Sequence, residues 1–288
     1  MNSSTDRDLL KNADDKVVEG FGKEWSTFSY GPQHAKEVRT IFSDYFSIFP
    51  KEALTKTAIG FDAGCGSGRW AAMVAPMVGQ LHCVDASREA LGVSRRNLAQ
   101  QSNVQFHQAS AGDLPFASRS MDFGYSLGVL HHMPDTQAAV NECARVLKPG
   151  APFLVYLYYA FDNRPAWFRA IWRVSDRVRS IICRLPFGLQ AFLCNILAIT
   201  VYWPLARMSR MLERAGVSVG SFPLSIYRQR SLYVMRNDAL DRMATKLEKR
   251  FTATEIRQML ETAGFVDVVF SQIPPFWCAV GRIPATES

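Results

Sequence analysis

The most chemically informative stretch of the sequence is FDAGCGSGRW, residues 61–70. It places Asp62 before Gly64, Gly66 and Gly68, three glycines at alternate positions that follow an apolar run. Such a spacing usually indicates a backbone turn that lets a nucleotide come close. Many loops of this kind bind a pyrophosphate, which favours helix N-termini and is repelled by carboxylates. The position of Asp62 at the mouth of this loop therefore requires another explanation.

Metal-binding and disulfide patterns are not found in the sequence. The six cysteines, at positions 65, 83, 143, 183, 194 and 278, show no CxxC spacing, and the five histidines show no HExxH pattern. We therefore expect no metal and no disulfide framework, but thiols in a reduced compartment. The first 16 residues are polar and charged, without the apolar core of a signal peptide, so we expect a cytoplasmic protein.

The net charge of +7 is concentrated in one segment. Residues 164–214 contain nine arginines, no lysine and two acids, Asp176 and Glu213, so this segment alone has a net charge of +7 and the rest of the chain is neutral. A uniformly basic nucleic-acid-binding protein would not show this distribution, and nucleic acid is not an expected partner. The 288 residues, 48% apolar, suit one large domain or one domain with an insertion.

Short apolar runs alternate with helix-like stretches over much of the chain. The predicted strands are 57–62, 80–85, 104–110, 122–127 and 152–158, and the helices between them are 68–78, 87–100 and 135–147. This βαβ rhythm predicts a parallel sheet with helices on both faces. A helix at 252–263, opened by a Thr cap, precedes strands at 265–272 and 276–283. Those two strands are so close in sequence that they can pair only antiparallel.

The combination resembles the class I S-adenosylmethionine-dependent methyltransferases, in particular the large group with the "methyltransferase type 11" pattern. The resemblance covers roughly residues 55–160 and 250–283. It rests on DAGCGSGRW, VDAS at 84–87, GDLPF at 112–116, LGVLHHMPD at 127–135 and VLKPGAPFLV at 146–155. It implies an α/β fold with a Rossmann-like, doubly wound, mostly parallel sheet and an antiparallel final strand, to which this chain adds a helical insertion.

The cofactor implied by the resemblance is S-adenosyl-L-methionine, which carries an ammonium and a sulfonium but no pyrophosphate. A carboxylate at the end of the first strand would then favour binding, and Asp62 would orient the methionine end. Asp85, 19 residues after Gly66, is expected to accept hydrogen bonds from the ribose hydroxyls. In the family, Asp113 contacts the adenine amino group and Leu114 flanks the ring. The expected cofactor-binding residues are Asp62, Ala63, Gly64, Cys65, Gly66, Gly68, Asp85, Ala86, Gly112, Asp113, Leu114 and Tyr30.

A nicotinamide dinucleotide is the alternative cofactor, because residues 66–71 also satisfy G-x-G-x-x-A and Asp85 could hold its ribose. Asp62, the acid of GDLPF and the terminal hairpin argue against an NAD-dependent dehydrogenase. If the glycines served only to form a tight turn, the positions of Asp85 and Asp113 would have no explanation.

Acceptor-binding candidates follow the strands at the edge where open α/β sheets bind ligands. His131 and His132 are the candidate catalytic residues, as a general base, or they pack at the start of the next helix. Tyr158 and Tyr159 would bind substrate or fill the core. Trp25, Asp241 and Arg242 are further candidates for substrate binding.

We expect three parts in the chain. Residues 1–57 form a flexible N-terminus and an aromatic helical lid with Phe21, Trp25 and Phe28 on one face; 58–160 and 250–288 form the methyltransferase domain; 161–249 form a helical, Arg-rich insertion. In the insertion, 166–185 is a basic amphipathic helix, and 185–206 is an uncharged run long enough to cross a bilayer.

Three interpretations of the insertion remain open: a cap over an apolar acceptor, attachment to an anionic membrane surface, or a homodimer interface. The first two imply a hydrophobic or lipid-like small molecule as acceptor, with oxygen preferred, and the second a location peripheral to the inner face of a membrane. Methylation of RNA or protein, and a non-catalytic protein that kept the cofactor site, are the alternative functions.

Overall fold

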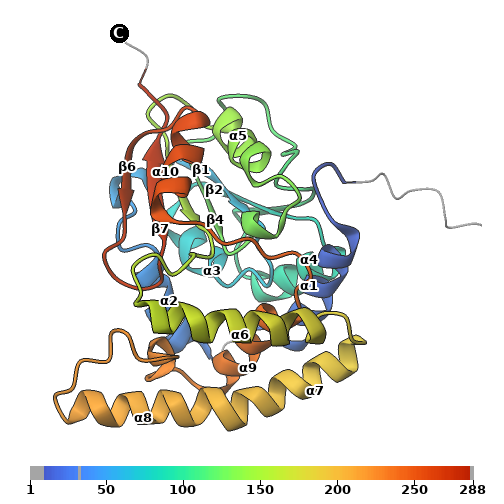
Figure 1. Ribbon diagram of the computed structural model, residues 1–288. Helices are drawn as coiled ribbons and strands as arrows, with labels where there is room; N and C mark the ends of the chain where they lie inside the picture. Colours follow the sequence, from blue (N-terminus) through green and yellow to red (C-terminus); the bar gives the residue numbers. More distant parts are fainter. Residues whose placement is uncertain (1–9, 32–33, 286–288) are drawn as a thin grey trace, which may run out of the picture. The chain divides into compact units, whose positions relative to one another are not determined.

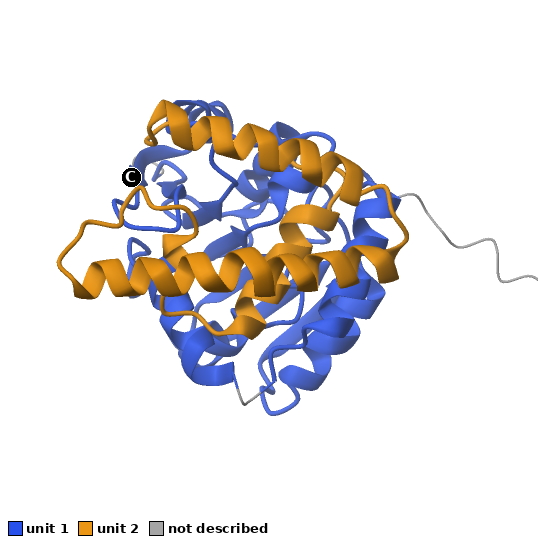
Figure 2. Ribbon diagram, turned by 60° about the horizontal axis from the view of Figure 1, so that its bottom comes forward, with its two compact units in different colours: residues 1–160, 249–288 blue, residues 161–248 orange. Residues whose placement is uncertain are grey.

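The computed structural model describes residues 10–31 and 34–285 of the chain. These residues form two compact units (Figure 2). Unit 1 comprises residues 1–160 and 249–288, and unit 2 comprises residues 161–248. Unit 2 is therefore a continuous segment inserted into the sequence of unit 1, and its bounds lie within one residue of those expected for the insertion.

Unit 1 is built on a seven-stranded sheet with the order β3-β2-β1-β4-β5-β7-β6 (Figure 1). Its strands are β1 Ile59–Ala63, β2 Gln80–Asp85, β3 Val104–Gln108, β4 Phe123–Leu127, β5 Pro152–Tyr156, β6 Val266–Phe270 and β7 Cys278–Arg282. Strands β1–β5 pair in parallel, whereas β7 pairs antiparallel with both β5 and β6. The predicted fold class, including the antiparallel final strand, is confirmed.

Helices cover both faces of this sheet. They are α1 Asp15–Thr27, α2 Ala35–Tyr45, α3 Ala71–Val74, α4 Arg88–Asn97, α5 Thr136–Val146 and α10 Ala253–Thr262. The expected Thr cap of the last helix is present: Thr252 and Glu255 form a reciprocal capping box. The predicted helix over 68–78 is shorter than expected, since α3 ends at Val74 and a 3₁₀ turn containing Pro76 follows it.

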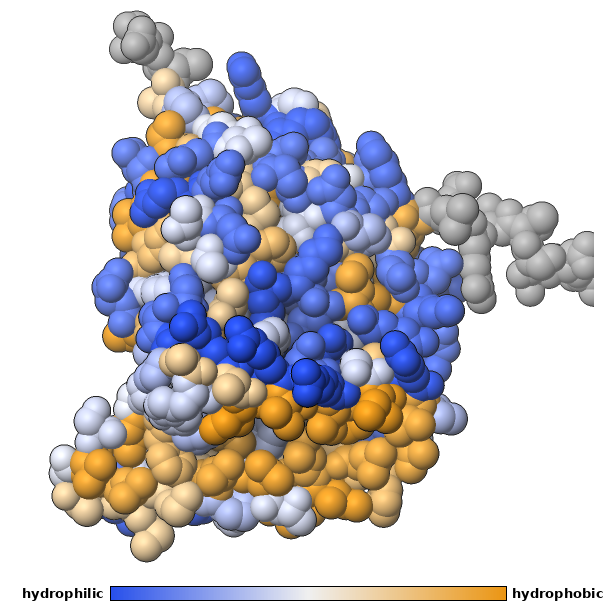
Figure 3. All heavy atoms as spheres, in the orientation of Figure 1, coloured by the Kyte–Doolittle hydropathy of each residue, from blue (hydrophilic) through white to orange (hydrophobic). Residues whose placement is uncertain are grey.

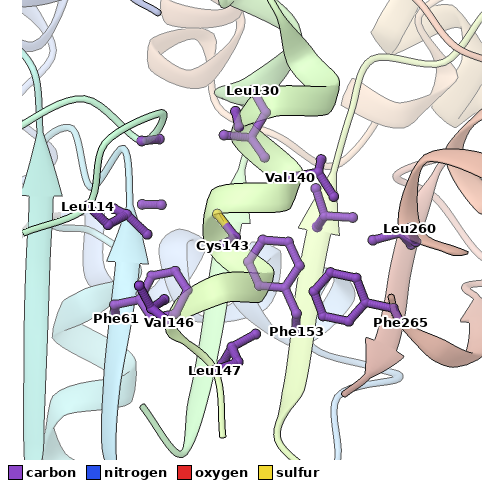
Figure 4. Packing of buried hydrophobic residues seen from close by; sticks show 14 of the residues in the cluster. Phe61, Leu114, Leu130, Val140, Cys143, Val146, Leu147, Phe153, Leu260 and Phe265 are labelled. Atoms are coloured by element: carbon purple, nitrogen blue, oxygen red, sulfur yellow. The ribbon is translucent and has the colours of Figure 1, made fainter. Parts of the chain in front are cut away.

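One face of the sheet forms a core with α5 and α10 (Figure 4). The rings of Phe61, Phe153 and Phe265 form a stack, with centroids 6.2 Å and 5.5 Å apart. On the opposite face, Phe46 after α2 lies 5.3 Å from the ring of Tyr125 on β4. Residues of β4 therefore alternate between the two faces, and Tyr125 points to the α2 side.

Unit 2 is helical. Its elements are α6 Ala166–Ile182, α7 Phe187–Leu197, the π-helical turn η5 Ala198–Tyr202, α8 Trp203–Arg214 and α9 Leu232–Ala244. The segment α7–η5–α8 is one continuous helix, Phe187–Arg214. Both α6 and α7 pack against α9. The amphipathic helix expected at 166–185 is present as α6, but much of its apolar side is exposed.

Candidate cofactor site at the carboxyl edge of the sheet

The expected cofactor-binding residues meet at one edge of the sheet because β1, β2, β3 and β4 run in parallel. Asp62 and Ala63 end β1, Asp85 ends β2, and residues 109–116 follow β3. The carboxyl ends of parallel strands are where open α/β sheets bind ligands. Ala63 and Cys65 are buried, and Ala86 is partly exposed.

The glycine loop after β1 is held by backbone hydrogen bonds to the end of β2. The N–H groups of Gly64 and Cys65 both donate to the carbonyl of Val84, at 2.8 and 3.0 Å. Gly66 has a φ of +54°, and a Cβ at this position would lie 2.8 Å from the ring of Trp25. Glycine is therefore required at position 66 by the turn and by the side chain that covers it.

Asp62 is the most unusual group of this edge. Its side chain is 1% exposed, and neither carboxylate oxygen has a hydrogen-bond partner of good geometry among the described residues. The sheet register places it beside Cys83 on β2 and Tyr125 on β4. Burial raises the pKa of Asp62 to about 8, although Tyr125 and Arg69 oppose this and Asp85 adds to it. A cationic ligand is the kind of partner that would compensate such a group.

Asp85 is already oriented by two backbone donors. Its Oδ2 accepts from the N–H of Gly66, and its Oδ1 accepts from the N–H of Ser87, both at 2.8 Å. Removal of its carboxyl from water raises the pKa of Asp85 to about 6, although both hydrogen bonds lower it. Each oxygen keeps acceptor capacity for a further donor, such as a hydroxyl of a ribose.

The loop after β3 borders the same edge of the sheet as the glycine loop and Asp85. The N–H of Gly112 donates to Ser110 Oγ at 3.0 Å, and the N–H of Leu114 donates to Glu142 Oε1 at 2.7 Å. Leu114 is buried, whereas Asp113 is exposed. An apolar wall beside an accessible carboxylate is the arrangement that an adenine with an exocyclic amino group would use.

The two histidines after β4 lie in an aromatic cluster. Both are buried, their rings are 4.0 Å apart, and His131 stacks on Tyr158 at a centroid distance of 4.0 Å. Neither ring nitrogen of His131 has a hydrogen-bond partner among the described residues. Burial, the neighbouring His132 and Arg250 hold the pKa of His131 well below its usual value. His131 is therefore a neutral imidazole with an unused lone pair.

The N-terminal segment lies over these loops. The ring of Trp25 covers Gly66, and the ring of Phe21 is 5.0 Å from that of His132. The Asn12 side chain donates to the carbonyl of Asp135 and accepts from its N–H. Asn12 and its neighbours were expected to be flexible, and no motif indicated this contact. Residues 1–9 lie outside the described chain.

Other predicted site residues are distributed as follows. Tyr30 is buried, and the guanidinium of Arg69 lies 4.6 Å from its ring and 4.9 Å from that of Trp25. Phe28 is the C-cap of α1 and does not continue its helical face. Tyr159 lies beside Phe276, with centroids 5.8 Å apart. Asp241 and Arg242 belong to α9 of unit 2, and their role stays a prediction.

Tyr125 and Arg250 were not among the predicted site residues. Tyr125 lowers the pKa of Asp62, and Arg250 lowers the pKa of His131. The chain contains many tyrosines and arginines, and only the folded structure shows which of them lies beside each site residue. Within residues 10–31 and 34–285, no group of three or more His, Cys, Asp or Glu side chains could hold a metal ion. All six cysteines are buried thiols that form no disulfide.

The site residues fit S-adenosylmethionine on observations of this structure. Asp62 is a buried carboxyl that lacks a hydrogen-bond partner of good geometry among the described residues and is suited to an ammonium or sulfonium, Asp85 can accept from a diol, and the glycine loop gives backbone access. The residues that would hold it are therefore the loop at 62–68, Asp85 and the segment 112–114.

Part of the chain is similar in sequence to known methyltransferases. Residues 61–155 match the family model described as "Methyltransferase domain". Over 105 residues the chain is 38% identical to the "Uncharacterized methyltransferase YcgJ" of Bacillus subtilis, covering 35% of this chain and 41% of that protein. Over 94 residues it is 35% identical to the "O-methyltransferase resE" of Aspergillus sclerotiorum, covering 31% and 36%. The chain thus spans less than half the length of the curated relatives it matches.

Among solved structures, one neighbour is a chain of the Haloferax volcanii complex that contains the Trm112 methyltransferase activator. It aligns with a TM-score of 0.50 at 16% identity, over 92% of this chain and 97% of that chain. At this identity the likeness shows the fold alone.

The raised pKa of Asp62 leads to a prediction about stability. The folded protein is expected to keep a proton on Asp62 up to about pH 8, while the unfolded chain releases it near the ordinary aspartate pKa of 3.8, so the free energy of unfolding falls as pH rises between these values. In the ligand-free protein, Asp62→Asn should therefore be more stable than wild type by about 2–5 kcal/mol at about pH 8, and by much less at about pH 5.

Urea titrations at both pH values measure this difference. Asp113→Asn, which removes an exposed carboxyl from the same edge, is the matched control. A gain in Asp62→Asn that is the same at both pH values would show that the buried carboxyl does not retain its proton.

Proposed function

We propose, from the premise that residues 61–155 form a methyltransferase domain within a class I methyltransferase fold, that this protein is an enzyme that transfers a methyl group from S-adenosylmethionine to the hydroxyl of a small, hydrophobic acceptor. The observation that supports the proposal most strongly is the buried Asp62 carboxyl at the glycine loop, whose oxygens have no hydrogen-bond partner of good geometry among the described residues and whose pKa is lowered by the neighbouring Tyr125 and Arg69 less than it is raised by burial. A pyrophosphate-containing cofactor would place negative charge where this site already contains two carboxyl groups.

The work of the protein is to bind and align. When bound, S-adenosylmethionine supplies a methyl group on a positively charged sulfur, which is a reactive electrophile. Methyl transfer is an in-line displacement, so holding the acceptor oxygen on the methyl–sulfur axis provides much of the rate enhancement. Asp62, Asp85 and the glycine loop would hold S-adenosylmethionine, and the aromatic cluster after β4 would hold the acceptor.

His131 is the group that supports a hydroxyl acceptor. A hydroxyl must lose its proton as it is methylated, and a neutral imidazole can accept that proton. His131 is neutral because of its burial, and both of its ring nitrogens lack a partner in the described protein. Relatives named as O-methyltransferases, including those of Aspergillus sclerotiorum and Penicillium expansum, are consistent with this choice.

The neighbours of His131 support an apolar acceptor. Tyr158 stacks on its ring, and Tyr156 lies 5.9 Å from Tyr158. Phe21 of α1 faces the adjacent His132. Aromatic walls of this kind favour a planar or aliphatic molecule with few charges.

The cofactor assignment predicts that Asp85→Asn weakens binding of S-adenosylhomocysteine by about 10- to 150-fold, because a charged acceptor for the ribose hydroxyls is lost. Calorimetric titration of both proteins measures the change. Glu142→Gln serves as control, since it alters a carboxylate that bonds to Leu114 and lies behind the site wall. Equal affinity of wild type and Asp85→Asn would contradict the assignment.

The acceptor assignment predicts that His131→Phe retains S-adenosylhomocysteine affinity but lowers the rate of methyl transfer by about 100- to 10,000-fold. The assay follows tritium from methyl-labelled S-adenosylmethionine into a panel of uncharged phenols and aliphatic alcohols. His107→Gln, a histidine on β3 that pairs with His82, is the control. Transfer by His131→Phe at the wild-type rate would remove His131 as the base, and labelling of amines alone would overturn the choice of oxygen.

A further inference from the structure

One exposed side of α6 carries a stripe of apolar side chains along its whole length. The exposed large apolar residues follow one another at intervals of four and three, which places them in a single stripe. They are Trp167, Ile171, Val174, Val178 and Ile181, between 45% and 65% exposed. A stripe of this size on a soluble helix is usually buried against another surface.

The continuous helix Phe187–Arg214 shows a second exposed apolar surface. Its exposed large side chains are Leu189, Phe192, Ile196, Ile199, Val201, Trp203, Met208 and Met211. This helix is long and apolar enough to cross a membrane, but such a property is also found in helices of soluble proteins. Its charges begin only at Arg207, because residues 185–206 contain none.

The two surfaces lie on helices of the same unit. Helices α6 and α7 both pack on α9, and Figures 1 and 2 show α6 and the α7–α8 helix converging where α6 connects to α7 and diverging toward their other ends. In Figure 3, an orange band lies directly below a row of dark blue residues at the level of α6, and the region of α7 and α8 beneath it is largely orange and tan, with white and pale blue residues among them. Thirteen of the 17 exposed large apolar side chains of the described residues lie on these helices. We call this set of thirteen the apolar face.

Positive charge borders the apolar face. Five arginines of the segment are exposed: Arg169, Arg173, Arg177, Arg184 and Arg214. The two acids of residues 164–214 are both in ion pairs, Asp176 with Arg179 at 2.7 Å and Glu213 with Arg228 at 2.8 Å. The guanidinium of Arg207 also lies 3.9 Å from the ring of Trp203. The surroundings of the face therefore attract anions.

We propose that the apolar face binds the surface of an anionic phospholipid bilayer, with its apolar side chains in the region between headgroups and acyl chains and its arginines at the phosphates. Amphipathic helices with arginines on the polar side and tryptophan at the border bind membranes in this way. The proposal goes beyond the proposed function and does not depend on it.

Two other occupants of this face are less consistent with its charge and packing. A second copy of the chain would bring another set of arginines to the face, and both acids of this segment are already paired. A helix that spans the bilayer would have to leave α9 and take Gln190 and Ser209, both buried in the folded protein, into hydrocarbon.

The test is flotation of the full chain with vesicles. One vesicle preparation contains only phosphatidylcholine, and the other contains phosphatidylcholine and phosphatidylglycerol at about 7:3. We expect the protein to float with the anionic vesicles, to bind the neutral ones at least about 10-fold more weakly, and to dissociate as salt increases from about 0.05 to 0.5 M.

Two variants separate the contributions. Arg173→Gln/Arg177→Gln should weaken binding to the anionic vesicles by about 10- to 30-fold, since each arginine near such a surface adds to the attraction. Ile171→Glu/Phe192→Glu should weaken binding by about 100-fold or more, because two apolar side chains are replaced by carboxylates. The matched controls in unit 1 are Arg39→Gln/Arg96→Gln and Val269→Glu/Ile273→Glu, which change exposed residues of the same types.

Circular dichroism and S-adenosylhomocysteine binding show whether each variant is folded. The proposal is overturned if the wild type binds neither vesicle, or if the controls lose as much binding as the variants. It is also overturned if the wild type is a dimer that Ile171→Glu/Phe192→Glu separates without any effect on vesicle binding. Resistance of the bound protein to alkaline carbonate extraction would indicate a spanning helix instead.

Discussion

The burial of the Asp62 carboxyl at the end of β1 is the constraint on which the candidate site depends. Parallel pairing of β1 with β2 and β4 fixes its neighbours as Cys83 and Tyr125, and neither supplies a positive charge. A carboxyl in such surroundings disfavours its own ionisation, and the pKa of about 8 expresses this. An amide there is therefore expected to make the ligand-free protein more stable, whereas a cationic ligand would favour the ionised carboxyl.

The neighbouring elements are arranged around this buried carboxyl. The glycine loop brings backbone close to the carboxyl while its N–H groups bond to Val84 and Asp85. Helix α1 then covers the loop with Trp25, and a Cβ at Gly66 would not leave room for that ring. Asp62, Asp85, the glycine loop and Trp25 thus form one connected piece of structure at the edge of the sheet.

Much of this arrangement could be predicted from the sequence. Strand β2 lies at the predicted residues, the other strands begin and end within two residues of their predicted bounds, and the antiparallel end of the sheet follows from a connection too short for a crossover. An aromatic helix over the site was predicted, but the residues that it contacts were not. Its contacts through Asn12 and Phe21 join residues more than 100 positions apart, and no local pattern specifies such pairs. The amphipathic pattern of α6 indicated a helix, but the pattern does not say whether a protein or a lipid covers its apolar side.

Asp62 is expected to hold a proton until a cationic ligand displaces it. Calorimetric titration with S-adenosylhomocysteine at about pH 7, in buffers of different ionisation enthalpy, counts the protons released on binding. The account predicts that the wild type releases up to about one proton more than Asp62→Asn, because the ligand ammonium favours the ionised carboxyl. Equal proton release by the two proteins, with both still binding the ligand, would contradict it.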